Sequence, residues 1–117
     1  MITIKKEFHF SSAHQLHGLP ADHPCSRLHG HNYVLTVFLT GEVNTIGFVQ
    51  DYRDLDKIKN YVDNVLDHKF LNDVFPTHNT TVENMCKILF DIFKQDYPLL
   101  SAIEISETPK TNCRYEP

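Results

Sequence analysis

The stretch that decides the fold is His31-Asn-Tyr-Val-Leu-Thr-Val-Phe-Leu-Thr-Gly41. Strand side chains alternate between two faces, so every second residue points the same way. One side of this strand carries Tyr33, Leu35, Val37 and Leu39. This apolar side is expected to pack on helices. The other side includes Val34 and Phe38, so a second covering partner is expected there, with another subunit as the natural candidate.

The segments around this strand predict an α+β fold made of a single domain over residues 1–117. Two strands precede two helices, and two more strands follow, which predicts an antiparallel four-stranded sheet with both helices on one face. The expected elements are a strand over 2–10, a loop over 15–30, a strand over 31–41, a helix over about 54–67, a connection over 69–79, a helix that starts directly after Thr80 and runs to about Gln95, and strands over 102–107 and 113–116.

Both helices have capping signals at their starts. Asp51 or Asp54 can cap the first helix, because an Asp side chain accepts hydrogen bonds from free backbone N–H groups. The second helix is preceded by Thr80-Thr81-Val82-Glu83, which is typical of a capping box with Thr at the N-cap and Glu at N3. Cys86 lies on the apolar stripe of this helix and is interpreted as a core residue.

The composition is that of an ordinary globular chain. Hydrophobic residues make up 41% and charged residues 22% of the 117 residues, and the formal charge is -4. This balance gives no reason to propose nucleic acid or a membrane surface as a partner. Three cysteines without a repeated spacing and a start that is soon charged favour a reducing cytoplasm with free thiols.

Three of the eight histidines are arranged as metal ligands would be. In an extended chain His29 and His31 point to the same side, Gly30 leaves the space between them open, and His14 would close the triangle from another segment. Zinc favours imidazole, and a catalytic zinc site keeps three protein ligands and one open position. Cys25 is either a fourth ligand of a closed structural site or a free thiol beside an open metal.

Several short motifs then occur in a fixed order. They are Ala13-His14, Cys25-x-x-x-His29-Gly-His31, Asp67-His68, Thr81-x-Glu83 and Glu107-Thr108. This set resembles the 6-pyruvoyl-tetrahydropterin synthase family over essentially the whole chain. The three residues between Cys25 and His29 are most similar to its bacterial 6-carboxy-5,6,7,8-tetrahydropterin synthase branch. The resemblance implies the tunnelling fold, in which oligomerisation joins the sheets into a barrel and two trimers stack as a homohexamer.

The resemblance also assigns roles to the metal-proximal residues. It implies Zn²⁺ on His14, His29 and His31, with the side-chain diol of a pterin triphosphate at the open position. Cys25 would be the general base, since a nearby metal favours the thiolate. His68 would relay protons and Asp67 would orient it. An alternative for His68 is that it only interacts with the carbonyl end of the preceding helix.

Further residues are implied to bind the substrate. Glu107 would anchor the pterin by accepting two parallel hydrogen bonds. Thr81 and Glu83 match pterin-contacting positions, although the capping box already accounts for Glu83. The triphosphate requires positive charge, and the basic candidates are Arg27, Lys69, Lys110 and Arg114.

The implied activity is a zinc-dependent, triphosphate-eliminating lyase reaction in queuosine biosynthesis. It converts 7,8-dihydroneopterin triphosphate to 6-carboxytetrahydropterin, acetaldehyde and triphosphate. One alternative is the same fold making 6-pyruvoyltetrahydropterin for tetrahydrobiopterin-type synthesis. Others are an aldolase-like cleavage of dihydroneopterin without zinc and a non-catalytic zinc-binding module with Cys25 as fourth ligand.

Overall fold

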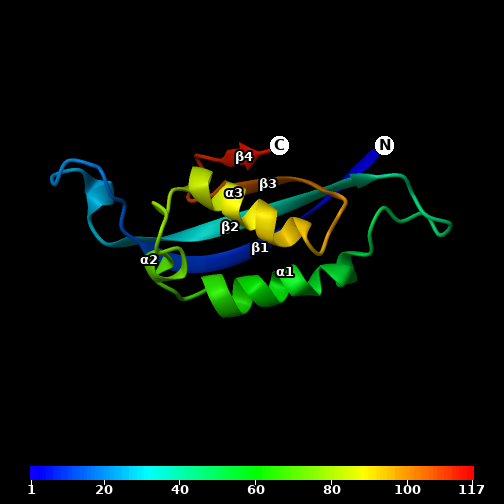
Figure 1. Ribbon diagram of the computed structural model, residues 1–117, viewed down its shortest axis with the longest axis horizontal. Helices are drawn as coiled ribbons and strands as arrows, with labels where there is room; N and C mark the ends of the chain where they lie inside the picture. Colours follow the sequence, from blue (N-terminus) through cyan, green and yellow to red (C-terminus); the bar gives the residue numbers. More distant parts are fainter.

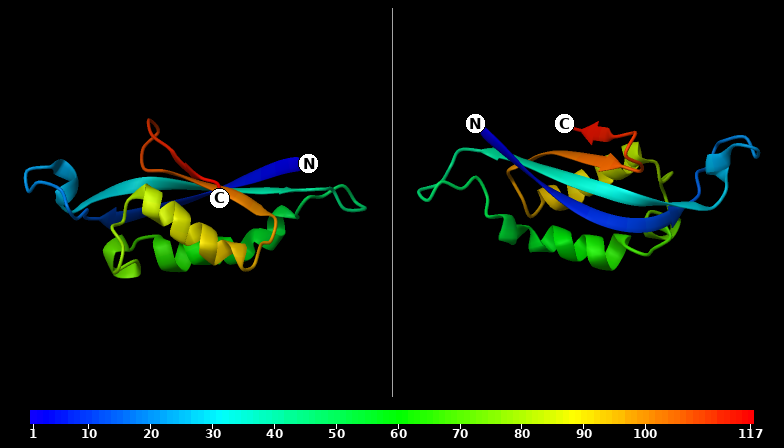
Figure 2. Two further views of the ribbon diagram at one scale, coloured as in Figure 1. Left: turned by 45° about the horizontal axis from the view of Figure 1, so that its top comes forward. Right: turned by 180° about the vertical axis from the view of Figure 1, so that it is seen from behind.

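The computed structural model describes residues 1–117, which form a four-stranded antiparallel sheet in the order β1-β2-β3-β4. Figure 2 shows that the helices cover one face of this sheet. The elements in Figure 1 are β1 (Ile2–His14), β2 (His29–Gly41), α1 (Asp56–Tyr61), α2 (Leu71–Val74), α3 (Val82–Lys94), β3 (Leu100–Ser106) and β4 (Cys113–Tyr115). This arrangement confirms the predicted α+β class.

β1 and β2 are longer than predicted and pair along their whole length, from Ile2 opposite Gly41 to His14 opposite His29. The prediction ended the first strand at residue 10 because the following Ser-Ser-Ala has no apolar alternation. Cross-strand pairing with residues 30–32 extends the strand instead. The loop between the strands therefore covers residues 15–28, and Figure 1 shows it projecting from one end of the molecule.

The first predicted helix is a continuous helical stretch in three parts. A 3₁₀ turn over Tyr52–Leu55 leads into α1, and a π turn over Val62–Leu66 ends it. Asp51 is the N-cap, and its side chain accepts a hydrogen bond from the Arg53 amide. The connection over 69–79 contains the short helix α2, which the prediction missed because only four residues are helical.

The predicted capping box at the start of α3 is wrong by one position. Thr81, not Thr80, is the N-cap, and its hydroxyl accepts a hydrogen bond from the Asn84 amide at 3.2 Å. Glu83 is consequently the second helical residue and has no capping role. Thr80 is fully buried instead. A capping box therefore does not explain the presence of a glutamate at position 83.

The core lies between the sheet and the helices and includes Cys86, as predicted. On β2, the residues that face it are at most 1% exposed: Tyr33, Leu35, Val37 and Leu39. On the opposite side Val34 and Phe38 are only half-buried, and the Arg114 guanidinium lies 4.5 Å from the centre of the Phe38 ring. The covering of this face by another subunit stays a prediction. No helix has both the length and the apolar character that a membrane crossing requires.

Candidate metal centre and substrate cleft

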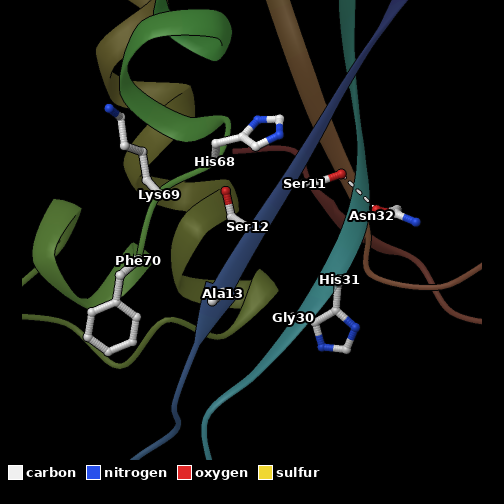
Figure 3. A pocket seen from close by; sticks show the side chains of 9 residues that line it. All are labelled: Ser11, Ser12, Ala13, Gly30, His31, Asn32, His68, Lys69 and Phe70. Carbon is white, nitrogen blue, oxygen red and sulfur yellow. Dashed lines mark hydrogen bonds between the residues drawn. The ribbon is translucent and has the colours of Figure 1, made fainter.

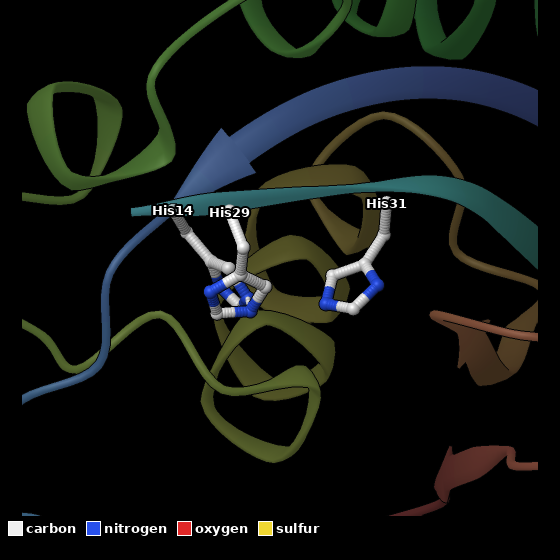
Figure 4. A group of neighbouring side chains, drawn as sticks. All are labelled: His14, His29 and His31. Atoms are coloured by element: carbon white, nitrogen blue, oxygen red, sulfur yellow. Dashed lines mark hydrogen bonds between the residues drawn. The ribbon is translucent and has the colours of Figure 1, made fainter. Parts of the chain in front are cut away.

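Three histidines meet where β1 ends and β2 begins (Figure 4). His14 lies directly opposite His29 in the strand register, and His31 is two residues further along β2, so all three side chains share one face. Their ligand nitrogens lie within 4.8 Å of one another. Gly30 between them leaves the site open, because a Cβ there would make a tight contact with the carbonyl oxygen of Ser12 at 3.2 Å.

Hydrogen bonds to carbonyls determine which ring nitrogens carry protons. His14 Nδ1 lies 2.8 Å from the Thr80 carbonyl oxygen, and His29 Nδ1 lies 2.7 Å from that of Arg27. Carbonyls only accept, so both Nδ1 atoms donate, and the neutral rings point two Nε2 lone pairs at each other across 2.9 Å. Burial lowers the pKa of His14, which favours this neutral form. A cation between the two lone pairs satisfies both, as in metal sites whose histidines donate to carbonyls.

His31 supplies a buried nitrogen that lacks a protein partner. Its Nε2 makes no hydrogen bond, although the Glu107 carboxylate is 3.2 Å away, because the two groups are not aligned for one. Burial lowers the pKa of His31, and the Glu107 charge opposes that shift. Leaving a buried polar atom unpaired is costly, and a metal ion would satisfy it. The three imidazoles therefore fit a metal ion.

Cys25 lies in the loop before β2, in a short 3₁₀ turn over Pro24–Ser26, and is half-buried. Its amide donates to His23 Nδ1 at 3.0 Å, and its carbonyl accepts from the Leu16 amide at 3.0 Å. Its sulfur is not among the clustered ligand atoms, which comprise the three imidazoles alone. This arrangement favours a thiol outside the metal's ligand set over a fourth ligand.

Asp67 and His68 contact each other, because the helical stretch ends at Leu66 and the chain turns sharply. Asp67 Oδ2 lies 2.8 Å from His68 Nδ1. The Asp67 carboxylate also accepts from the Ser11 amide at 2.8 Å, and this bond, followed by the one to His68, lowers the Asp67 pKa. His68 has a φ of 58°, in the left-handed region that non-glycine residues seldom adopt. The helix does not continue through His68, and the imidazole of His68 faces Asp67 and solvent.

His68 lies apart from the metal cluster within one subunit. Its side chain is 84% exposed, and in Figure 3 β1 runs between it and His31. The two histidines line a shared hollow with Ser11, Ser12, Ala13, Gly30, Asn32, Lys69 and Phe70. The proposed proton-transfer pair is thus presented outward at the edge of the sheet.

Glu107 follows the end of β3 and lines a cleft of about 330 Å³. The other residues of the cleft are Val82, Glu83, Thr111, Asn112 and Cys113. Glu107 also approaches His31, so it lies between the cleft and the histidine cluster. Thr81 precedes these residues as the N-cap of α3. Cys113 is a residue of the cleft that was not predicted, since only the turn before β4 brings it there.

The predicted basic residues do not gather at one place. Lys69 lies in the hollow beside His68, and Arg27 is exposed in the loop before β2. Lys110 lies with Val34 and Thr36 on the sheet face that lacks helices. Arg114 is held by Glu104 at 2.9 Å and Glu116 at 3.2 Å. The carboxylates of Glu104 and Glu116 neutralise Arg114, whereas Arg27, Lys69 and Lys110 have no ion-pair partner.

The sequence model of the family described as 6-pyruvoyl tetrahydropterin synthase matches residues 3–117. The chain belongs to this family. The 6-carboxy-5,6,7,8-tetrahydropterin synthase of Haemophilus influenzae is 32% identical over 142 residues, which cover 99% of each chain. The protein of the same name from a Synechocystis strain is 32% identical over 98% of this chain and 93% of its own.

A solved structure of another family member has nearly the same fold. The 6-pyruvoyl tetrahydropterin synthase of Caenorhabditis elegans has a TM-score of 0.89 and 32% identity, over 99% of this chain and 95% of its own. The relatives of the present chain thus include proteins named 6-carboxy-5,6,7,8-tetrahydropterin synthase and proteins named 6-pyruvoyl tetrahydropterin synthase.

Proposed function

We propose that this protein is a 6-carboxy-5,6,7,8-tetrahydropterin synthase, a zinc-dependent lyase acting on 7,8-dihydroneopterin triphosphate. The observation that carries the proposal is the position of Glu107, which lies in the cleft and 3.2 Å from His31 of the imidazole cluster. A pterin ring held by this carboxylate would extend its side chain toward the metal. The bacterial relatives with this name support the choice of reaction.

His14, His29 and His31 would hold Zn²⁺, which suits three neutral imidazoles with one side open. When bound, zinc supplies Lewis-acid stabilisation of charge on the side-chain oxygens. Glu107 would accept two hydrogen bonds from the amino group and ring N–H of the pterin. Thr81 and Glu83 would complete the cleft, and the free carboxylate of Glu83 supports this role.

Cys25 would remove a proton from the substrate side chain as general base. His68, oriented by the 2.8 Å contact with Asp67, would transfer protons to and from the reacting oxygens. Elimination then releases triphosphate, which Arg27 and Lys69 would neutralise. Cleavage of the remaining side chain consumes one water molecule, which supplies the second oxygen of the ring carboxylate, and releases acetaldehyde.

The outward position of His68 supports an active site completed by neighbouring subunits. Its imidazole is 84% exposed and lies across β1 from the metal cluster, so a neighbouring chain can bring a second cluster to it. We infer a cytoplasmic homohexamer of two trimers, with the sheets joined as a barrel. Such joining also removes the exposed edge of β1.

The second candidate is formation of 6-pyruvoyltetrahydropterin, favoured by the likeness to the Caenorhabditis elegans enzyme. The deciding experiment is turnover of 7,8-dihydroneopterin triphosphate by the purified protein, with products identified by mass spectrometry, before and after chelation. Carboxytetrahydropterin with acetaldehyde, lost on chelation and restored by zinc, is the expected result. A pyruvoyl product establishes the second candidate, and turnover that survives complete metal removal contradicts both.

A further inference from the structure

Two asparagine side chains hold the strip of chain that follows the metal ligand His14. Asn72 Oδ1 accepts from the Gln15 amide at 3.0 Å, and its Nδ2 donates to the Gln15 carbonyl at 2.8 Å. Asn79 does the same to His17, with its Oδ1 at 2.9 Å from the amide and its Nδ2 at 3.1 Å from the carbonyl. Each side-chain amide thus pairs with the backbone as a neighbouring strand would.

Asn72 and Asn79 make every hydrogen bond between the loop over residues 15–28 and the segments that follow β2. Both side chains are half-buried, whereas Gln15 and His17 are exposed. The exposed loop is therefore attached to the protein body by two amide clamps.

The clamps are connected directly to the metal site. Thr80, which follows Asn79, accepts the Nδ1 hydrogen bond of His14 with its carbonyl, and its hydroxyl lies 3.4 Å from Asn72 Oδ1. Asn84, in the first turn of α3, donates to the Asn79 carbonyl at 2.9 Å. The groups that orient His14 and those that hold the loop thus belong to one hydrogen-bonded unit at the start of α3.

The same strip also carries Cys25. The Leu16 amide, between the two clamped residues, donates to the Cys25 carbonyl at 3.0 Å. The Gln15 side chain donates to the Ser26 carbonyl at 2.8 Å. The asparagines hold the backbone of Gln15 and His17, which flank Leu16. Leu16 in turn holds the turn that contains Cys25. This strip therefore links the turn that carries Cys25 to the chain that follows His14.

We propose that Asn72 and Asn79 are positioning residues that set where Cys25 lies relative to the metal ligand His14. The consequence for catalysis rests on the proposed function, in which Cys25 is the general base. Misplacing a catalytic group by a small distance is enough to lower the rate strongly. Losing a group that orients a metal ligand costs about 10- to 100-fold in metal affinity or activity.

The test compares Asn72→Ala, Asn79→Ala and the double variant with a matched control, Asn44→Ala. Asn44 makes the acceptor half of this pairing in the distant loop after β2, where its Oδ1 accepts from the Ile46 and Phe48 amides at 3.0 Å. Zinc affinity is measured by chelator competition, ligand geometry from the visible spectrum of the cobalt-loaded protein, and Cys25 accessibility from its iodoacetamide alkylation rate by peptide mass spectrometry. kcat and KM are measured on the zinc-loaded protein.

We expect the double variant to lose about 10-fold in zinc affinity, to change its cobalt spectrum, and to alkylate Cys25 at least about threefold faster. kcat should fall about 10-fold while KM stays within about twofold. The proposal is overturned if zinc affinity, cobalt spectrum and alkylation rate match those of Asn44→Ala, even if thermal stability falls. Changes in these three readouts with unaltered kcat support the clamps and contradict the catalytic role of Cys25.

Should the alanine variants not fold, Asn72→Asp and Asn79→Asp serve the same comparison. Aspartate has the same shape and keeps the Oδ1 acceptor, but it removes the Nδ2 donor to the Gln15 or His17 carbonyl. The expected changes in zinc affinity and Cys25 alkylation have the same direction. Values equal to those of the Asn44→Asp control would overturn the proposal.

Discussion

The Glu107 carboxylate lies 3.2 Å from Nε2 of His31 without forming a hydrogen bond to it. A residue at the end of β3 and a residue near the start of β2 thus place a negative charge beside the imidazole cluster. The carboxylate keeps its hydrogen-bonding capacity for another molecule, and His31 keeps its buried nitrogen for an ion. This relationship supports the proposed placement of the pterin ring beside the metal.

Replacing this carboxylate should weaken substrate binding. Glu107→Gln keeps the shape but removes the charge that strengthens a bidentate hydrogen bond, which is typically about 1.5–3 kcal/mol for a charged partner. We expect KM to rise by at least about 10-fold in steady-state kinetics. Glu104→Gln is the control, since Glu104 pairs with Arg114. An equal effect of the two variants would argue against a pterin anchor at Glu107.

Cys25→Ala should separate zinc binding from turnover. Because the thiol lies outside the imidazole cluster, the variant should bind zinc with the affinity of the wild type. Loss of a general base should lower kcat by about 10²- to 10⁴-fold. Metal content by elemental analysis and turnover are measured on the same preparation. Joint loss of zinc and turnover would instead identify Cys25 as a ligand.

The pH dependence of stability should reveal the Asp67 carboxylate. The Ser11 amide and His68 hold its pKa below the usual 3.8 in the folded protein. The folded state therefore binds this proton less tightly than the unfolded state, and the carboxylate stabilises the fold above pH 3.8. This contribution is lost as pH falls through the lower folded pKa.

The measurement is urea unfolding of the wild type and of Asp67→Asn between about pH 5 and pH 2.5. The wild type should be more stable at pH 5, and the difference should shrink steadily below about pH 4. Asp63→Asn is the control, because Asp63 is exposed and pairs only with Lys59. A difference that stays constant to pH 2.5 would contradict the lowered pKa.

Tyr33→Phe should leave stability unchanged or raise it by up to about 1 kcal/mol. The Tyr33 hydroxyl is buried without a hydrogen-bond partner, while its ring stacks on Phe10 with centroids 4.8 Å apart. Removing the hydroxyl eliminates a buried polar group that has no hydrogen-bond partner, and it keeps the ring stacking on Phe10. The unfolding free energy is measured with a chelator present, so that metal binding does not contribute.

Tyr97→Phe provides the matched comparison for Tyr33→Phe. The Tyr97 hydroxyl donates to the Asp54 carbonyl at 2.6 Å, so its removal should cost about 1 kcal/mol. We expect the changes in unfolding free energy of the two variants to have opposite signs or to differ clearly in size. If Tyr33→Phe is the more destabilising of the two, its hydroxyl has a partner, such as a bound water.

The start of α3 illustrates where local patterns stop being informative. On sequence alone Thr80 and Thr81 are both suitable N-cap residues, and the Glu at position 83 favours the earlier one. The structure uses Thr81, because Thr80 is buried and its carbonyl accepts the hydrogen bond of His14. A contact with a residue far away in the chain thus decides the helix boundary.

The sequence by itself determined the order and type of the main strands and helices, the buried face of β2 and the common side of His29 and His31. These follow from periods of 2 and 3.6 residues, which are local properties of the backbone. Only the tertiary structure decided that His14 lies opposite His29, that Glu107 approaches His31, and that Asn72 holds Gln15. Those relationships depend on strand register and on contacts between residues distant in sequence, which no local period encodes.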